Sequence, residues 1–184
     1  TTVMFTIQEA VTTFVYPQSI YRIGINATFS TVPAASGSSL SFSIESGALP
    51  AGLLLRATDG AIEGVPSEAV ESQTVVVKAQ NLVSFRVVSL VFTVRNPPTH
   101  FFYDPSSYVL ARGSSFSSTP HVEGQELSFS VHTGFLPSGL HLNATTGEIS
   151  GTFDEAVRLQ SVSIRVSNIA GSAVATLSFT ILSP

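Results

Sequence analysis

The sequence predicts an all-β fold made of two tandem β-sandwich domains. Three observations lead to this prediction. Apolar residues alternate with polar ones at a period of two, which is the spacing of half-buried strands. Glycine and proline turn signals separate the short apolar runs. The chain also contains an internal duplication, and its 184 residues provide enough length for two domains of sandwich size.

The composition favours strands and excludes several classes of function. Hydrophobic residues make up 43% of the chain and charged residues only 11%, so an ordered core is expected. One lysine and seven scattered arginines give a net charge of −4, without the clustered positive charge that nucleic acid binding requires. Because cysteine is absent, disulfides, thiolate metal sites and thiol nucleophiles are excluded. Regular Ser and Thr interrupt the apolar runs, and none reaches the roughly 20 residues of a membrane span.

The duplication is the most informative feature of the sequence. Leu40–Ile44 (LSFSI) recurs as Leu127–Val131 (LSFSV), 87 positions later. About 25 of the 55 positions from Leu40 to Val94 are identical in the second copy. The other matched segments are Gly47–Leu53 with Gly134–Leu140, Thr58–Gly64 with Thr145–Gly151, and Leu90–Val94 with Leu177–Ile181.

The same offset predicts the domain boundaries. Val3–Ile7 precedes Leu90–Val94 by 87 positions, which suggests that residues 1–7 are the last strand of a preceding repeat. The alternative is that they form an extra first strand of the first domain. Residues 8–95 and 96–184 are then two complete repeats, and the chain is expected to be an excerpt from a longer array.

Strand patterning predicts which side chains form the core. Val162, Ile164 and Val166 alternate with polar residues, and so do apolar positions between Val174 and Ile181. Aromatic residues recur at inward positions of both copies, so they are predicted to be core residues: Phe42, Phe92, Phe129 and Phe179. The outward strand positions are expected to be mostly Ser and Thr.

Conserved spacing between the copies also predicts the turns. Gly60 and Gly147 lie between short apolar strands, where a tight hairpin needs positive φ. Pro50 and Pro137 are expected to bend the chain at the start of a strand, because proline fixes φ and donates no hydrogen bond. The structural turn motif comprises Pro50, Gly52, Gly60 and Gly64 in the first copy, and Pro137, Gly139, Gly147 and Gly151 in the second. Between the copies, Asn96, Pro97 and Pro98 are predicted to form a stiff hinge.

These turn residues resemble a known family. The run from Leu49 to Pro66 is similar to the putative-immunoglobulin (He-PIG type), or dystroglycan-type cadherin-like, repeat family, whose signature is Leu-Pro-x-Gly-Leu followed by Thr-Gly-x-Ile-x-Gly-Thr-Pro. The second copy matches the signature from Leu136 but has Phe153 in place of its proline, and Val65 replaces a threonine in the first. The resemblance implies immunoglobulin-like or cadherin-like sandwiches in large surface or secreted proteins, without catalytic activity.

No pattern of catalytic or metal-binding residues is found in the sequence. The four histidines, His100, His121, His132 and His141, are not shared between the copies, and no Gly-x-Ser-x-Gly elbow is present. Calcium sites need several clustered carboxylates, but the three aspartates lie far apart in the sequence. The chain is therefore predicted to be no enzyme and to use no cofactor or metal, calcium at the joint included.

Two kinds of candidate surface residue remain. Asn26-Ala-Thr28 and Asn143-Ala-Thr145 are glycosylation acceptor sequences, so Asn26 and Asn143 are candidate glycan sites. Some aromatic residues are expected to be exposed and available for contacts, namely Phe101, Phe102, Tyr103 and Phe135.

The function predicted from these features is a non-catalytic structural or adhesion module. It would belong to a longer tandem-repeat protein at the cell surface or outside the cell, and such a protein could form filaments. Its partners are expected to be proteins or neighbouring copies of the same repeats, and glycans are also considered. The alternative is a carbohydrate-binding or ligand-binding accessory or spacer module of a secreted enzyme, which would need a concave patch of exposed aromatics.

Overall fold

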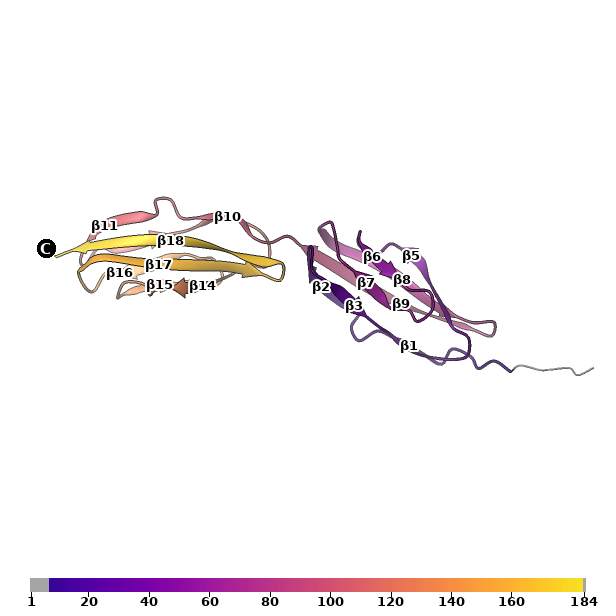
Figure 1. Ribbon diagram of the computed structural model, residues 1–184. Helices are drawn as coiled ribbons and strands as arrows, with labels where there is room; N and C mark the ends of the chain where they lie inside the picture. The colour runs from indigo at the N-terminus through magenta and orange to yellow at the C-terminus, as the bar shows by residue number, and fades with distance from the viewer. Residues whose placement is uncertain (1–6, 184) are drawn as a thin grey trace, which may run out of the picture. The chain divides into compact units, whose positions relative to one another are not determined.

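The computed structural model describes residues 7–183, which contain eighteen strands and no helix. The prediction of an all-β fold is confirmed. The chain divides into two compact units, and the boundary between them lies between Arg95 and Asn96 (Figure 1). The units are called repeat 1 and repeat 2 below. The prediction for residues 1–7 concerns a segment that lies, except for Ile7, outside the described residues.

Repeat 1 consists of nine described strands in three sheets. A four-stranded sheet has the order β2-β9-β8-β5, a three-stranded sheet has the order β3-β7-β6, and β1 pairs with β4. β2 runs parallel to β9, whereas the other neighbours are antiparallel. The strands are β1 (Thr13–Val15), β2 (Ile20–Gly24), β3 (Phe29–Thr31), β4 (Ala34–Ser36), β5 (Ser41–Gly47), β6 (Leu53–Leu55), β7 (Ile62–Gly64), β8 (Val70–Gln80) and β9 (Phe85–Arg95).

Repeat 2 has the same topology. Its sheets have the orders β11-β18-β17-β14, β12-β16-β15 and β10-β13, with β11 parallel to β18. Two facing sheets with this pairing are the arrangement of an immunoglobulin-like sandwich. The strands are β10 (Thr99–Phe102), β11 (Ser107–Ala111), β12 (Ser115–Ser118), β13 (His121–Glu123), β14 (Ser128–Thr133), β15 (Leu140–Leu142), β16 (Ile149–Thr152), β17 (Val157–Asn168) and β18 (Gly171–Leu182).

Each repeat has its own hydrophobic core between the sheets. Phe92 and Phe179 are fully buried at matched positions of the last strands, and Phe42 and Phe129 are also buried. These four were predicted as core residues from the sequence. The alternating valines and isoleucines of β8 and β17 complete the cores, since every second side chain of a strand points to the same face.

Two hairpins, β6–β7 and β15–β16, each contain a glycine that no other residue could replace without strain. Both the positive φ and the lack of room for a side chain require glycine there. Gly60 and Gly147 have φ values of +74° and +75°. A Cβ at Gly60 would lie 2.7 Å from the Phe42 ring, and one at Gly147 would lie 2.7 Å from the Phe129 ring. The glycines therefore let the turns pack directly against the core.

The expectation that Tyr103 is exposed is wrong. Tyr103 is buried, and its hydroxyl donates a 2.6 Å hydrogen bond to the carbonyl of Gly147 in the β15–β16 hairpin. Tyr16 makes the same bond to Gly60 at 2.7 Å. Phe101 is half-buried rather than exposed, because its ring packs against Tyr103 and Phe129. A buried tyrosine needs a partner for its hydroxyl, and the hairpin carbonyl provides it.

The predicted hinge residues are part of the fold of repeat 2. Pro98 is buried and lies against Gly124, and it occupies the position that the core residue Val11 has in repeat 1. The carbonyl oxygen of Asn96 accepts a 2.8 Å hydrogen bond from the side-chain amide of Asn168. The segment from Asn96 to Pro98 is thus held by repeat 2 itself.

Candidate functional site

Five apolar side chains form a contiguous group on the outer face of the four-stranded sheet of repeat 1. Phe85, Val87 and Val91 lie on alternate positions of β9, opposite to the core residues Leu90 and Phe92. Ile20 on β2 and Val76 on β8 lie on the same outer face. This group, Ile20, Val76, Phe85, Val87 and Val91, is called the apolar stripe.

Strand pairing brings these side chains together. Ile20 pairs directly with Val91 across β2 and β9. Val76 pairs with Ser89, which places it diagonal to both Val87 and Val91. Directly paired side chains have Cβ atoms about 5 Å apart, and diagonal ones are still within reach of each other. The apolar stripe is therefore a single surface.

The apolar stripe is accessible to solvent. Phe85 is 64% exposed, Ile20 is 56% exposed and Val87 is 48% exposed. Val76 and Val91 are half-buried between them. Single exposed apolar residues are common on protein surfaces, but a contiguous apolar group on a sheet face is characteristic of an interaction site.

The matched positions of repeat 2 are mostly polar, although Val109 and Leu182 are exposed elsewhere on the same face. Four of the five stripe positions carry serine there, namely Ser107, Ser163, Ser172 and Ser178, and only Val174 remains apolar. The serines and a neighbouring threonine bond to one another: Ser163 to Thr176 at 2.9 Å, and Ser178 to Ser107 at 3.0 Å. The two copies therefore share a core but differ on this surface.

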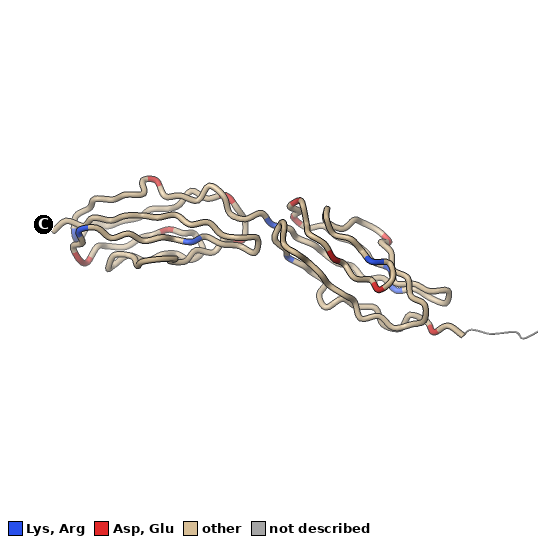
Figure 2. The backbone as a smooth tube through the Cα atoms, viewed as in Figure 1, with Lys and Arg blue, Asp and Glu red and all other residues tan. Residues whose placement is uncertain are grey.

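Charged residues of both signs flank the apolar stripe. Lys78 forms an ion pair with Glu45, and its ammonium also lies 6.0 Å from the centre of the Phe85 ring. Arg95 pairs with Glu71 at 3.0 Å at the far end of β9. Figure 2 shows that charged residues are thinly spread over each repeat. The outer face of repeat 1 thus carries paired charges next to the apolar side chains, with Lys78 directly opposite Val87.

This surface was not predicted from the sequence, because the outward strand positions are expected to be mostly Ser and Thr. That expectation describes repeat 2 but is wrong for the stripe positions of repeat 1. The duplication contained the information needed to find the surface. Positions at which the two copies differ are not part of the core that both copies share. Phe85 against Ser172 and Val91 against Ser178 are such positions.

The remaining predicted contact residues lie on repeat 2. Phe135 is 72% exposed in the loop between β14 and β15, and Phe102 is 47% exposed on β10. The ring of Phe102 stacks on that of His121 with centroids 4.8 Å apart. Phe102 and Phe135 come from different elements, and their role in contacts remains a prediction.

The candidate glycan sites are both at exposed turns. Asn26 follows β2 with a φ of +61°. Asn143 follows β15, and its side-chain oxygen accepts hydrogen bonds from the backbone N–H groups of Thr145 and Thr146 at 2.9 and 3.1 Å. This Asx turn starts the hairpin that Gly147 completes.

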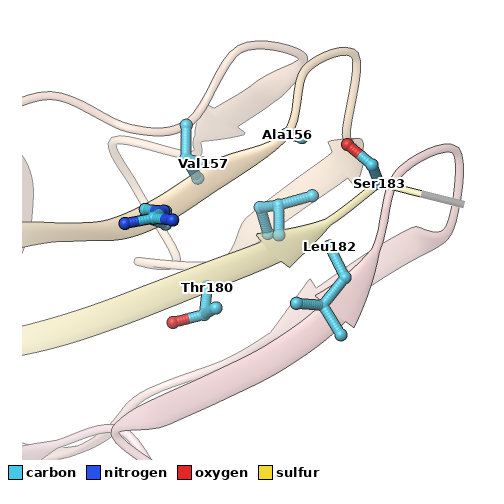
Figure 3. A pocket seen from close by; sticks show the side chains of 7 residues that line it. Ala156, Val157, Thr180, Leu182 and Ser183 are labelled. Atoms are coloured by element: carbon cyan, nitrogen blue, oxygen red, sulfur yellow. The ribbon is translucent and has the colours of Figure 1, made fainter.

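Repeat 2 contains a shallow pocket of about 250 Å³ at the end of its long strands (Figure 3). No aromatic residue lines it, so it offers no stacking platform for a sugar. At two matched positions repeat 1 has the Glu71–Arg95 ion pair where repeat 2 has Arg158 and Leu182. The lining residues are Ala156, Val157, Arg158, Thr180, Ile181, Leu182 and Ser183.

Within residues 7–183 no three His, Asp or Glu side chains are grouped so that they could hold a metal ion. Of the histidines, His100 lies 3.1 Å from Glu123, with both side chains about 70% exposed. In the same part of the chain, no helix of membrane-spanning length and hydropathy is found.

The comparison with protein families identifies the chain. The family described as "Putative Ig domain" (He-PIG) matches residues 5–97 and again residues 91–183. The chain therefore belongs to this immunoglobulin-like family and contains two tandem copies of its domain. A search of curated protein sequences gives no match.

Several solved structures of tandem domains superpose on this chain. A fragment of titin, domains I67–I69, superposes with a TM-score of 0.66 at 13% identity, over 95% of this chain and 67% of the fragment. Extracellular domains 3–5 of Drosophila OTK give a TM-score of 0.57 at 11% identity, over 95% and 63%. The N-terminal four Ig domains of Dscam1 give 0.53 at 15% identity, and this chain spans 46% of that fragment. At these identities the comparison shows the fold alone.

Proposed function

We propose that this chain is a non-catalytic structural and adhesive segment of a longer tandem-repeat protein, located outside the cell or on its surface. In this role the repeats act in series as folded spacers, and the apolar stripe contacts partner proteins or neighbouring copies. The two tandem domains of the He-PIG family support the serial arrangement.

The observation that carries the proposal is the way in which each repeat holds its two ends. In repeat 1 the backbone of Glu9 is bound by Asn81 at the β8–β9 turn, whereas Arg95 lies at the opposite end of β9. Eleven residues of extended strand separate these ends by about 37 Å. The Ile25 N–H also donates to the Arg95 carbonyl at 2.8 Å, so the leaving segment is tied as well. A domain held in this way transmits tension along its long axis.

Force spectroscopy on the chain held by its two termini tests the proposal. We expect two separate unfolding events, each releasing about 250 Å, because a repeat of about 88 residues extends to about 300 Å. Gly139→Ala, which places a methyl group 1.8 Å from the Thr152 carbonyl, should weaken only one event. A single event releasing both repeats, or gradual extension without resistance, would refute the role as a serial spacer.

The proposed location is tested through the acceptor sequences. In a eukaryotic secretory host, we expect a glycan at Asn143 or Asn26, since both side chains are exposed at turns. Mass spectrometry of the secreted chain and of the Asn26→Gln and Asn143→Gln variants measures this directly. Retention of the chain in the cell without modification would argue against passage through a secretory pathway.

A further inference from the structure

We infer that the apolar stripe is a self-association surface, which pairs with the same face of repeat 1 on a second copy of the chain. This inference rests on the adhesive part of the proposed function and names its partner. The surface is defined by Ile20, Val76, Phe85, Val87 and Val91.

The position of the apolar stripe within its sheet fits face-to-face pairing. In the order β2-β9-β8-β5, four of its five residues lie on the two central strands. The edge strand β5 presents Ser43 and Glu45 instead. Protein interfaces combine apolar residues with polar ones, and here Lys78 and Ser89 lie beside the apolar stripe on the central strands. Two such sheets can stack with their strands nearly aligned, about 10 Å apart.

The size of the face suits a weak but specific contact. Four strands of five to eleven residues, at a spacing of about 4.8 Å, give a face of roughly 500–700 Å². Two copies would together bury roughly 1,000–1,400 Å², at the lower end of the range for specific interfaces. A repeated array would strengthen such a contact through multiple simultaneous contacts.

The charges on this face permit two identical copies to approach. Lys78 is already paired with Glu45, and Arg95 with Glu71, so two copies bring both signs together rather than one. By contrast, this face has no excess of one sign of charge that would attract a strongly acidic or strongly basic partner. A two-fold contact requires only one patch, because the same residues serve on both sides.

The duplication explains why repeat 1 would carry this contact and repeat 2 would not. Repeat 2 has serine at four of the five stripe positions, and three of these serines form side-chain hydrogen bonds. Covering these hydroxyls without new partners would cost free energy, whereas covering the apolar stripe gains it. Pairing of repeat 1 with repeat 1 is therefore favoured over pairing with repeat 2.

Sedimentation of the whole 184-residue chain over about 1–500 μM tests the inference. The weight-average mass should rise toward that of two chains. Val87→Glu should weaken the association at least about tenfold, because each copy would then bring a carboxylate into the apolar contact. Val174→Glu is the matched control at the same position of repeat 2, and its wild-type side chain is 46% exposed compared with 48% for Val87. This control should leave the association within about twofold of wild type.

The reverse substitutions test sufficiency. Ser163→Val, Ser172→Phe and Ser178→Val transfer three stripe residues to repeat 2 and should produce assemblies larger than a dimer, since each chain would then have two contact faces. A monomeric wild-type chain at the highest concentration would overturn the inference, and so would equal effects of Val87→Glu and Val174→Glu. A monomer that still unfolds in two steps under force would leave the role as a serial spacer intact.

Discussion

The side-chain amide of Asn168 donates a hydrogen bond to the carbonyl oxygen of Asn96, at 2.8 Å. A second bond from the same amide goes to Gln125 at 3.2 Å, and the side-chain oxygen accepts from the N–H groups of Ala170 and Gly171. One side chain therefore joins the β17–β18 turn to the segment that enters the repeat and to the loop before β14. Asn81 makes the matching bonds in repeat 1.

Replacing this asparagine should loosen the end of the sandwich at which the chain enters. We expect Asn168→Ala to lower the free energy of unfolding of repeat 2 by about 2–3 kcal/mol, since several hydrogen bonds of about 1 kcal/mol each are lost. Chemical denaturation followed by hydrogen exchange at Gly171 measures the effect.

Asn168→Asp distinguishes the hydrogen bonds that this side chain donates from those that it accepts. The carboxylate still accepts from the turn but cannot donate, and it would face the carbonyls of Asn96 and Gln125. It should be at least as destabilising as Asn168→Ala. If Asn168→Asp preserves wild-type stability, the two donated bonds contribute nothing and the account is wrong.

The buried tyrosines provide a second test. Tyr103→Phe and Tyr16→Phe each remove one hydroxyl and leave a hairpin carbonyl without its donor. Each should cost its own repeat about 1–2 kcal/mol, and the two effects should add, because the residues lie in separate cores. Thermal or urea unfolding of the single and double variants measures this. A strongly non-additive double variant would contradict the independence of the cores.

Alkaline pH should destabilise both repeats through the same tyrosines. Burial raises the pKa of Tyr16, with smaller contributions from Tyr21 and Asp59. Burial likewise raises the pKa of Tyr103, with a contribution from Tyr108. The unfolded chain loses these protons first, near the ordinary tyrosine pKa of about 10, so the folded state binds more protons above that pH. The stabilisation is present in full below pH of about 10 and is lost as the pH rises further.

Unfolding midpoints measured from about pH 8 to pH 11 should therefore fall at the alkaline end. The double variant Tyr16→Phe, Tyr103→Phe should show a shallower fall, since phenylalanine does not titrate. A fall of the same steepness in wild type and double variant would assign the alkaline loss to other groups.

The duplication made most of the fold predictable. Matched segments gave the two-domain organisation, and the alternation of apolar residues gave the inward set, including Phe92 and Phe179. The same comparison would have corrected the expectation that Tyr103 is exposed. Tyr103 was grouped with the exposed aromatics beside it, although its match, Tyr16, marks it as part of the shared fold. Pro98 matches the core residue Val11, which marks it as part of the fold of repeat 2, and its role as a hinge residue stays a prediction.

The apolar stripe was harder to predict, for a physical reason. A period of two tells which side chains share a face but not which face turns inward when both are apolar. In β8, Val75, Val76 and Val77 follow one another, and only the pairing with β9 and β5 shows that Val76 is the outward one. Strand pairing between distant segments is a tertiary property, which local alternation does not contain.

The last prediction concerns the glycine at the start of β15. Gly139 has a φ of +87°, and a Cβ there would lie 1.8 Å from the Thr152 carbonyl oxygen and 2.8 Å from the Asp154 carboxylate. The backbones of the bend and of β16 approach so closely that no side chain fits between them. Gly139→Ala should therefore cost repeat 2 about 3 kcal/mol or more, since strands must separate as well as accept positive φ.

Gly113 is the matched control in the same repeat. Its φ of +83° is nearly the same, but no atom lies within 4 Å of the position that a Cβ would take. Gly113→Ala should thus cost only the backbone term of about 1 kcal/mol. The difference between the two variants, measured by urea unfolding, isolates the contribution of the close backbone approach. Equal losses of unfolding free energy would mean that positive φ alone requires glycine in the Leu-Pro-Ser-Gly-Leu turn. The close approach of the bend to β16 would then add nothing to the cost of the substitution.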